Sequence, residues 1–335
     1  MRTRLLLIAV LSLAVLAALA ARPATADLPL EPFTATSYWK TPSSAPADPR
    51  SGAMISWLSS VLKTDRKFVT IRASNLNGSS AQGTAVYYAS ATDPQWKICH
   101  NPNYKSYFWT TDFDSVRIPS GAKAPTDNDA DMMVYNEFQG KLFWFTNMQF
   151  LSGRWCASQA SVYFIGSNGL HGKLLQSDNV KNWGKHGLAP VTQAVRWSEV
   201  ASGLVPHVMD VYIPSVSCNN QAPNGKDWFP LYQGTMCTTS ATGSIPAGAV
   251  LRIKPTVDLS QYPLSPVARV LAQALQTYGA VVGDRSGVGN NVTIKLEDTV
   301  VEGKGNLWLN AGVKFDALKV IPLSAYQIDT LGTPR

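Results

Sequence analysis

Histidine, cysteine and charged residues are scarce in this sequence. Its 335 residues include four histidines and four cysteines, and 15% are charged. The lysines and arginines are not gathered into blocks, which argues against nucleic-acid binding. The cysteines form no Cys-x-x-Cys pair or spaced Cys/His set, which argues against a structural zinc site. A Gly-x-Ser-x-Gly motif and its strand–helix alternation are also missing, so a serine hydrolase of the α/β class is disfavoured.

The one long hydrophobic run stands at the start of the chain. Arg2 and Arg4 precede an apolar stretch over residues 5–21, and Ala-Thr-Ala stands directly before Asp27. This order of basic, apolar and small-residue segments is typical of a secretory signal peptide. We expect residues 1–26 to be removed and the protein to be secreted, with no membrane span after processing. An uncleaved membrane anchor is the alternative.

Cleavage would leave a mildly basic chain. The signal segment carries three arginines and no acidic residue, so the mature chain keeps 26 basic residues against 22 acidic ones, a net charge of +4. Such a charge favours contact with an anionic polymer, and it is too small and too dispersed to indicate nucleic acid as the partner.

The four cysteines lie in a chain that we expect to be exported, where thiols tend to oxidise. Two disulfides are therefore predicted, and three pairings of Cys99, Cys156, Cys218 and Cys237 are formally open. We favour Cys218 with Cys237, because this bond closes a loop rich in Pro, Asn and Gly. That choice leaves Cys99 with Cys156.

Most of the sequence has the pattern of short β-strands. Runs rich in Val, Tyr, Phe, Trp and Thr, separated by Gly, Asn, Asp and Ser, fill residues 66–257. Residues 131–147 predict a hairpin around the turn Glu-Phe-Gln-Gly. We therefore expect a mainly β protein, in the form of an antiparallel β-sandwich or jelly roll with one or two short packing helices.

Two segments have helical periodicity. Residues 48–63 carry an apolar stripe, and a second stripe starts after Ser265, a good N-cap, and stops at Gly279. The second helix leads directly into an apolar strand. No internal repeat and no change of composition marks a domain boundary, so we take residues 27–335 as a single secreted domain.

Three residues are candidates for acid–base catalysis. His207 alternates with apolar residues along a predicted strand, so it either forms a hydrogen bond inside the core or faces a cleft as a general acid or base. Asp210 lies on the opposite face of the same strand. Asp284 ends a short apolar strand, where its carboxylate either folds back onto the turn or faces a ligand. We predict His207, Asp284 and Asp210 as catalytic residues.

Basic and aromatic residues are candidates for substrate binding. Two cations on one strand face, with an arginine beside Asp284, suit a bound carboxylate or sulfate; a solvated sheet face is the alternative. Ten tryptophans are present, and such rings either stack on sugars or pack in a β core. The predicted substrate-binding residues are Arg252, Lys254, Arg285, Trp39 and Trp155.

An acidic run raises the question of calcium. Asp127, Asp129 and Asp131 recur at every second residue, but Met132 stands where an EF-hand needs glycine and Phe138 where it needs glutamate. We therefore expect a surface turn before a strand, and neither a metal nor another cofactor. A single structural Ca²⁺ is left open without support from the motif.

Six segments stand out in combination: SYWKTP, DPRSGAM, GKHGLAP, GLVPHVMDVYIP, AGAVLRIKPTVDLS and LSPVARVLAQALQTYGAVVGDRSG. Together, over most of residues 35–330, they resemble a family of secreted, mostly actinobacterial β-sandwich proteins of poorly defined function. The resemblance implies an extracellular, carbohydrate-active protein and attaches no reaction to these motifs. The chain departs from the family at Lys40, where Asn is common, and in DADM, where Asp-Gly-His is more usual. The second departure weakens a role for Asp131.

Two functions are consistent with these features. The first is an enzyme that cleaves an extracellular polysaccharide. A lyase needs a cation for a uronate carboxylate and a base such as His207, whereas a glycoside hydrolase needs two carboxylates, for which Asp284 and Asp210 are the first candidates. The second is a secreted protein that binds glycan or cell-wall polymer without turnover. Convergence of His207, Asp284 and a basic residue in one groove would favour the enzyme.

Overall fold

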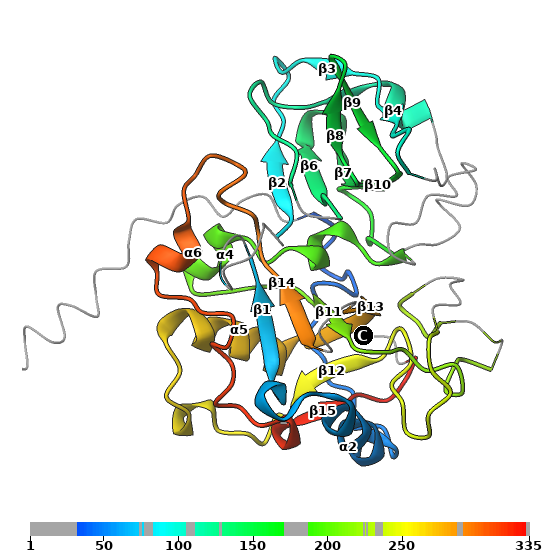
Figure 1. The fold of residues 1–335 in the computed structure, drawn as a ribbon, viewed down its shortest axis with the longest axis vertical. Coiled ribbons are helices and arrows are strands. Elements are labelled where there is room, and N and C mark those ends of the chain that lie inside the picture. The colour runs from blue at the N-terminus through cyan, green and yellow to red at the C-terminus, as the bar shows by residue number, and fades with distance from the viewer. Residues whose placement is uncertain are drawn as a thin grey trace, which may run out of the picture.

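The computed structural model describes residues 32–73, 76, 83–104, 111–126, 129–170, 187–223, 225, 227–231, 237–286 and 291–332. Within these ranges a six-stranded sheet and its helices form one layer, and a four-stranded sheet with smaller two- and three-stranded sheets lies above it (Figure 1). The predicted signal peptide lies outside the described residues. None of the helices in the described ranges is both long and apolar enough to cross a bilayer.

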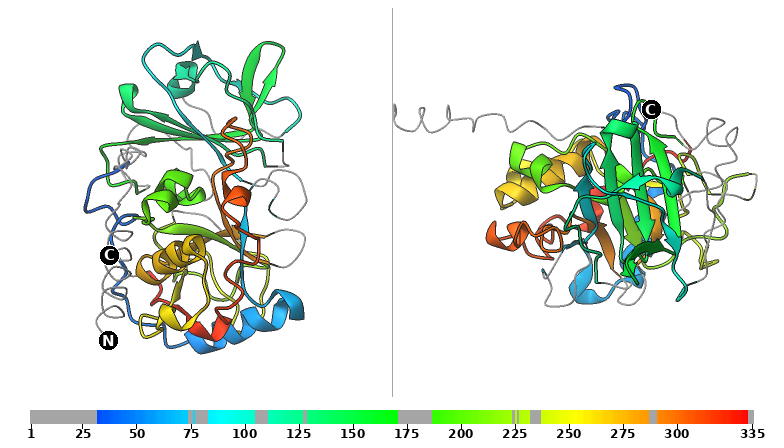
Figure 2. Two further views of the ribbon diagram at one scale, coloured as in Figure 1. Left: turned by 90° about the vertical axis from the view of Figure 1, so that its left-hand side faces the viewer. Right: turned by 90° about the horizontal axis from the view of Figure 1, so that it is seen from above.

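The six-stranded sheet mixes parallel and antiparallel pairs. Strand β1 pairs with β14 in parallel, as does β11 with β13, and the other neighbours are antiparallel. The strands in spatial order are β1 (Val69–Arg72), β14 (Val292–Lys295), β11 (Met209–Ile213), β13 (Ala280–Arg285), β12 (Val250–Ile253) and β15 (Tyr326–Ile328). Two longer helices pack on this sheet, α5 (Pro266–Thr277) against β12 and α2 (Ser51–Val61) against β15 (Figure 2).

The four-stranded sheet contains the predicted hairpin. Strands β6 and β7 pair antiparallel through a 3-10 turn, η3 (Glu137–Gln139), and Gly140 at φ 65° closes it, so the hairpin is confirmed. In spatial order the strands are β10 (Gln159–Phe164), β7 (Lys141–Thr146), β6 (Met132–Asn136) and β2 (Ala85–Tyr88). The smaller sheets join β3 (Gln95–Trp96) with β5 (Val116–Arg117), and β4 (Cys99–His100) with β9 (Arg154–Ala157) and β8 (Gln149–Leu151).

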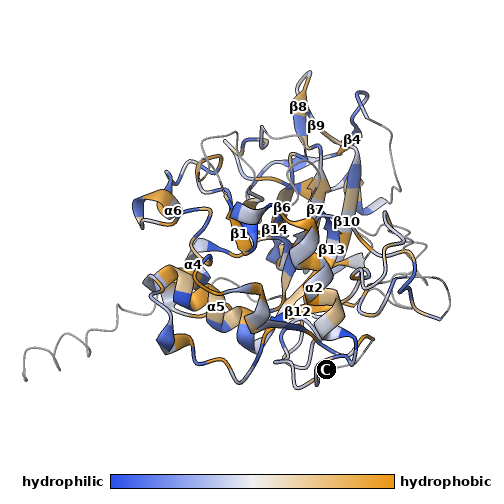
Figure 3. Cartoon of the chain, turned by 60° about the horizontal axis from the view of Figure 1, so that its bottom comes forward, coloured by the Kyte–Doolittle hydropathy of each residue, from blue (hydrophilic) through white to orange (hydrophobic). Residues whose placement is uncertain are grey.

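The remaining helical elements are short. They are α4 (Trp197–Ser202), α6 (Leu307–Asn310), η1 (Thr64–Arg66), η2 (Thr111–Asp114), η5 (Pro190–Gln193), η6 (Leu259–Gln261) and η7 (Leu323–Ala325). Helix α5 follows its sequence signals closely. The Ser265 hydroxyl accepts a hydrogen bond from the Ala268 N–H at 3.3 Å, and Gly279 adopts φ 73° just after the helix. Hydrophobic and hydrophilic residues alternate along α5 (Figure 3), and its buried residues face the sheet.

The hydrophobic core has two parts, and the four-stranded sheet separates them. Alternate residues of this sheet point to opposite faces. One face, including Val86 and Tyr135, joins the larger core above the six-stranded sheet. The other face, including Val134 and Phe145, joins the second core beneath the smaller sheets. The sheet is therefore buried on both sides, and one of its faces lies against the six-stranded sheet.

The mainly β fold with few short helices is confirmed, but the strand pairing is mixed, whereas a purely antiparallel arrangement was expected. Both preferred disulfides are present, Cys99–Cys156 with Cα atoms 4.3 Å apart and Cys218–Cys237 with Cα atoms 4.8 Å apart. The first joins neighbouring residues of β4 and β9, which the sequence alone does not reveal.

Candidate functional site

One strand of the six-stranded sheet buries its polar face. On β14 and just after it, Val292, Ile294 and Leu296 enter the core, whereas Thr293, Lys295 and Glu297 point the other way and are also buried. The alternation can be read from the sequence, but the sequence does not show whether the polar side is exposed or covered. The four-stranded sheet covers this side, so each polar group on it needs a partner.

Lys295 is the centre of a charged group on this face. Its Nζ lies 2.7 Å from Asp131 Oδ2 and 3.2 Å from Asp129 Oδ2, and 5.1 Å from the ring centre of Tyr212. Asp131 is fully buried and comes from the segment just before β6, while Tyr212 lies on β11. The side chain of Asp129 is 58% exposed, so the group reaches the surface on that side.

A β-bulge brings two predicted aspartates to the same place. In the parallel pair β11–β13 the register shifts, so that Tyr212 lies opposite Asp284 and Gly283 is an extra residue. An extra residue reverses the face of the side chains that follow it, which places Asp284 on the side of Tyr212. A Cβ atom at position 283 would collide with Oδ1 of Asp210. Glycine therefore allows the Asp210 carboxyl to lie over the bulge.

The carboxylates around Tyr212 affect the pKa of its hydroxyl group. Burial, followed by the charges of Asp210, Asp131 and Asp284, raises the pKa of Tyr212 well above its ordinary value. The phenol therefore stays protonated and can donate a hydrogen bond over the whole physiological range. We call the group formed by Tyr212, Lys295, Asp129, Asp131, Asp210 and Asp284 the Tyr212 site.

Asp210 and Asp284 have different surroundings within this site. Asp210 is buried, whereas Asp284 is half-buried and precedes the exposed Arg285 at the end of β13. Asp284 Oδ1 accepts a hydrogen bond from the Arg285 N–H at 2.7 Å, which is the local contact that the sequence left as the alternative. Both the local contact and the proximity to Tyr212 are thus present in the structure.

His207 does not belong to the Tyr212 site. The ring is fully buried, with Nδ1 2.8 Å from the Val208 carbonyl oxygen and Nε2 3.0 Å from Glu199 Oε1. Arg196 donates to the same Glu199 oxygen at 2.6 Å. Burial would raise the pKa of Glu199, but the charges of His207 and Arg196 outweigh it and lower the pKa to about 2. This arrangement matches the alternative of a core histidine, and the expected groove with Asp284 does not form around His207.

The predicted cations are engaged elsewhere. Arg252 is buried, and its Nε lies 2.9 Å from both carboxylate oxygens of Asp329 while its Nη2 donates to the Ala45 carbonyl at 2.7 Å. Lys254 donates to the Ser324 carbonyl at 2.7 Å. Both side chains therefore hold chain segments together, and the alternation along β12 did not reveal that its basic side is covered. Arg285 alone of the three lies beside the Tyr212 site.

The two predicted sugar platforms are core residues. Trp39 is fully buried and its Nε1 donates to the Gly169 carbonyl at 2.6 Å, and Trp155 is also buried. Trp155 does support a surface ring, because Phe150 packs on it at 5.2 Å between ring centres and also contacts Trp96 at 5.6 Å. Phe150 is 51% exposed. Phe150 is thus an exposed ring held by two tryptophans, and its sequence context alone does not mark it as a binding residue.

Tyr212, Lys295 and the Asp129–Asp131 pair were missed as site residues. The signals for them were the polar alternation along β14 and the closely spaced aspartates before β6. Neither signal shows that two distant segments meet. Asp127 lies outside the described residues, and within the described ranges no group of three or more His, Cys, Asp or Glu side chains is placed to hold a metal ion.

Comparison of the chain with protein-family models, curated proteins and solved structures gives no significant match. The resemblance to secreted β-sandwich proteins therefore stays a prediction. Any function has to be argued from the geometry of the Tyr212 site and from the exposed surface.

Proposed function

We propose that this chain is a secreted, carbohydrate-active enzyme that cleaves an extracellular polysaccharide by hydrolysis at the Tyr212 site. The observation that carries the proposal is the bulge at Gly283, which brings a buried carboxyl, Asp210, and a surface carboxyl, Asp284, to the same phenol. β-Bulges are frequent beside active sites, where they redirect a side chain. A glycoside hydrolase needs two carboxyl groups in different surroundings, one as a proton donor and one as a carboxylate.

The roles follow from the surroundings of each group. The Asp210 carboxyl, out of water, is suited to donate a proton to the leaving oxygen of a glycosidic bond. Asp284 faces solvent and is suited to stabilise the developing positive charge or to activate water. Tyr212, held in its protonated form, is suited to donate a hydrogen bond to one of the carboxylates. Lys295 and Asp131 hold the two sheets together around these groups.

The charge of the site favours a neutral glycan over a uronate. The Tyr212 site contains four carboxyl groups and one lysine, and that lysine is already paired with Asp131 and Asp129. A lyase would need a cation that is free to neutralise the substrate carboxylate. Arg252 is paired with Asp329, and the one exposed cation beside the site, Arg285, stands next to the carboxylate of Asp284, which would repel a uronate. Hydrolysis is therefore preferred to β-elimination.

Secretion is part of the proposal. The basic, apolar and small-residue segments at the start of the chain support export, and the two disulfides are consistent with an oxidising compartment. The partner of the mature protein is then an extracellular polysaccharide or cell-wall polymer, contacted without a metal or another cofactor.

The proposal is tested with the mature protein and a panel of neutral and uronate-bearing polysaccharides. We expect reducing ends to appear with a neutral polymer, and the Asp284→Asn variant to release them at least tenfold more slowly. The Asp65→Asn variant is the matched control, because the Asp65 side chain is 77% exposed and far from the site in sequence. Unsaturated-uronate absorbance would show a lyase instead, and unchanged activity in Asp284→Asn would remove the site from the mechanism.

A second candidate function is binding without turnover, and the exposed Phe150 ring favours it. Aromatic faces stack on sugar rings, and the Phe150 ring is held by edge-to-face contacts with Trp155 and Trp96. We expect Phe150→Ala to weaken retention on insoluble polysaccharide by about five- to tenfold. Phe138→Ala is the control, since Phe138 is 66% exposed on the η3 turn. Equal loss in both variants, or in neither, would contradict a binding platform at Phe150.

A further inference from the structure

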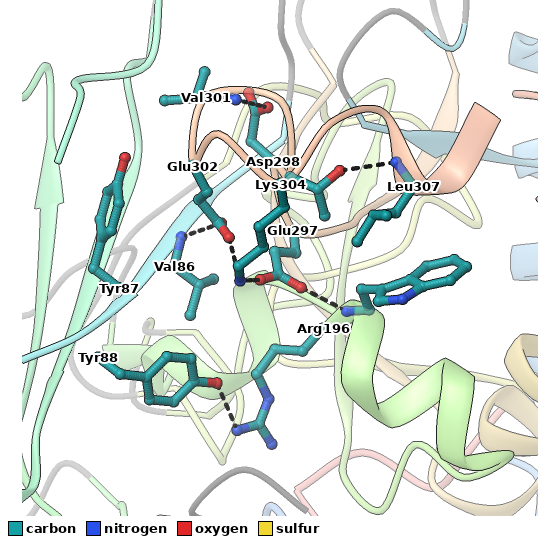
Figure 4. A network of polar contacts seen from close by, with 12 residues as sticks. Val86, Tyr87, Tyr88, Arg196, Glu297, Asp298, Val301, Glu302, Lys304 and Leu307 are labelled. Atoms are coloured by element: carbon teal, nitrogen blue, oxygen red, sulfur yellow. Dashed lines mark hydrogen bonds and ion pairs between the residues drawn. The ribbon is translucent and has the colours of Figure 1, made fainter. Parts of the chain in front are cut away.

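A loop that follows β14 fastens the two sheets to each other. We call residues 297–307 the clasp loop (Figure 4). It is held in shape by its own hydrogen bonds, from the Val301 N–H to Asp298 Oδ1 at 3.1 Å and from the Leu307 N–H to Thr299 Oγ1 at 3.3 Å. The indole Nε1 of Trp308 donates to the Glu297 carbonyl at 2.8 Å. The loop is thus a defined structure that presents its acidic side chains inward.

Two glutamates of the clasp loop bind the backbone of neighbouring elements. Glu302 Oε1 accepts a hydrogen bond from the Val86 N–H at 2.6 Å. Val86 lies on β2, an edge strand of the four-stranded sheet, and Glu302 therefore covers part of a free edge. Glu297 Oε2 accepts from the Trp197 N–H at 2.6 Å, in the first turn of α4, where helix N–H groups lack partners within the helix.

Lys304 forms ion pairs with both Glu297 and Glu302. Lys304 Nζ lies 2.7 Å from Glu297 Oε1 and 2.6 Å from Glu302 Oε2. The two glutamates are buried, whereas the lysine side chain is 43% exposed. Because both carboxyl groups contact the same Nζ, Glu297 and Glu302 lie next to each other. Two buried carboxylates with one cation would leave an uncompensated negative charge, so a proton on Glu302 is the stable arrangement.

The groups that face the pair do not offer a second cation. On the loop itself Asp298 is acidic, and burial raises its pKa. On β2, burial raises the pKa of both Tyr87 and Tyr88 to about 12, so both phenols are neutral. At α4, Arg196 is paired with Glu199 at 2.6 Å. Burial, followed by the charge of Glu297, accordingly raises the pKa of Glu302 to about 9, against the opposing effect of Lys304.

We propose that the clasp loop acts as a proton-dependent fastener: it holds the edge strand β2 against α4 and β14 while Glu302 carries a proton, and it loosens its hold on β2 when that proton is lost. Release follows because two adjacent buried carboxylates repel each other and seek water. Glu302 is the partner whose movement matters, since its carboxyl group joins the clasp loop to Val86 of β2, next to the backbone hydrogen bonds of Thr84 with Leu296 and Asp298. The proposal is independent of catalysis at the Tyr212 site.

The raised pKa of Glu302 determines how closure of the clasp loop depends on pH. An unfolded or open loop has a Glu302 with an ordinary pKa near 4.5, whereas the closed loop holds the proton up to about pH 9. The closed state therefore binds more protons between these values, and closure weakens as the pH rises through this window. The population of the open loop grows by up to about tenfold for each pH unit in the window.

Hydrogen exchange of the full mature chain tests the fastener. We expect the protection factor of the Val86 amide, corrected for the intrinsic exchange rate, to fall by up to about tenfold per pH unit between pH 5 and 9. In Glu302→Gln, the neutral side chain keeps an acceptor for Val86 and has no proton to lose. Protection in that variant should be independent of pH. Glu137→Gln, at an exposed position on η3, should retain the slope of the natural chain.

Infrared spectroscopy gives a second measurement that needs no variant. We expect a protonated-carboxyl band that persists above pH 7 and disappears on titration towards pH 9. A flat protection profile in the natural chain, an unchanged slope in Glu302→Gln, or the absence of that band at pH 7 would each overturn the proposal.

Discussion

Asp210→Asn is expected to lower the rate of polysaccharide cleavage by about 100- to 10,000-fold, the usual contribution of a general acid or base. The amide has nearly the same shape as the carboxyl group and fits over Gly283, but it cannot donate the proton to a leaving oxygen. The loss should appear in kcat more than in KM, because the missing interaction is made in the transition state. Initial rates of reducing-end release on the polymer that the wild-type chain cleaves measure this effect.

Thermal unfolding of the same variant separates chemistry from folding. We expect Asp210→Asn to keep a cooperative transition within a few degrees of the wild-type chain, since its volume is unchanged. His207→Ala should behave in the opposite way, with a clear loss of stability, because it leaves the buried Glu199 with one partner fewer. An Asp210→Asn variant that is folded and fully active would exclude Asp210 as the acid.

Lys295→Met is expected to destabilise the protein by about 3–5 kcal/mol, the cost of removing one partner from a buried ion pair. Asp131 is fully buried and would lose its cation at 2.7 Å. The free energy of unfolding from urea denaturation measures this effect. The contact joins the segment before β6 to β14, so the loss should extend to the attachment of the two sheets.

A double variant and a surface lysine supply the controls. Lys295→Met combined with Asp131→Leu removes both charges and should recover a large part of the loss, because no buried charge remains unpaired. Lys319→Met breaks an ion pair with Asp316 at the surface, where the Lys319 side chain is 58% exposed. This variant should lower the free energy of unfolding by about 0–1 kcal/mol. If Lys295→Met lowers the free energy of unfolding no more than Lys319→Met, then the buried pair of Lys295 with Asp131 does not stabilise the fold.

Local sequence signals were sufficient for the elements that depend on near neighbours. The cap at Ser265 and the stop at Gly279 predicted α5, and the segment around Glu-Phe-Gln-Gly predicted the β6–β7 hairpin. The composition of the loop between Cys218 and Cys237 favoured one disulfide, and the other followed by elimination. The helix and the hairpin depend on residues close together in the chain. The disulfides could be predicted because four cysteines allow only three pairings.

The site was harder to predict, because exposure depends on what covers a strand. The basic alternation in β12 and the polar alternation in β14 have the same form in sequence as solvated faces, yet Arg252 and Lys295 are both buried. The imidazole of His207 on an apolar face allowed two interpretations, and the contact with Glu199 favours the core histidine. Asp284 faces Tyr212 only because Gly283 is an extra residue in β13. The alternation of residues in the sequence does not reveal such a bulge.

The sequence by itself determined a mainly β chain with two disulfides, two longer helices and one hairpin, because propensity, caps and turn residues act over a few positions. The tertiary structure decided which polar faces are closed, which carboxyl groups meet at Tyr212 and which lysine serves Glu297 and Glu302. The pair of Asp131 and Lys295, for example, joins positions 164 residues apart in the chain. The energy of a charge is set by the solvent and partners around it in space, and these are fixed only when the two sheets pack together.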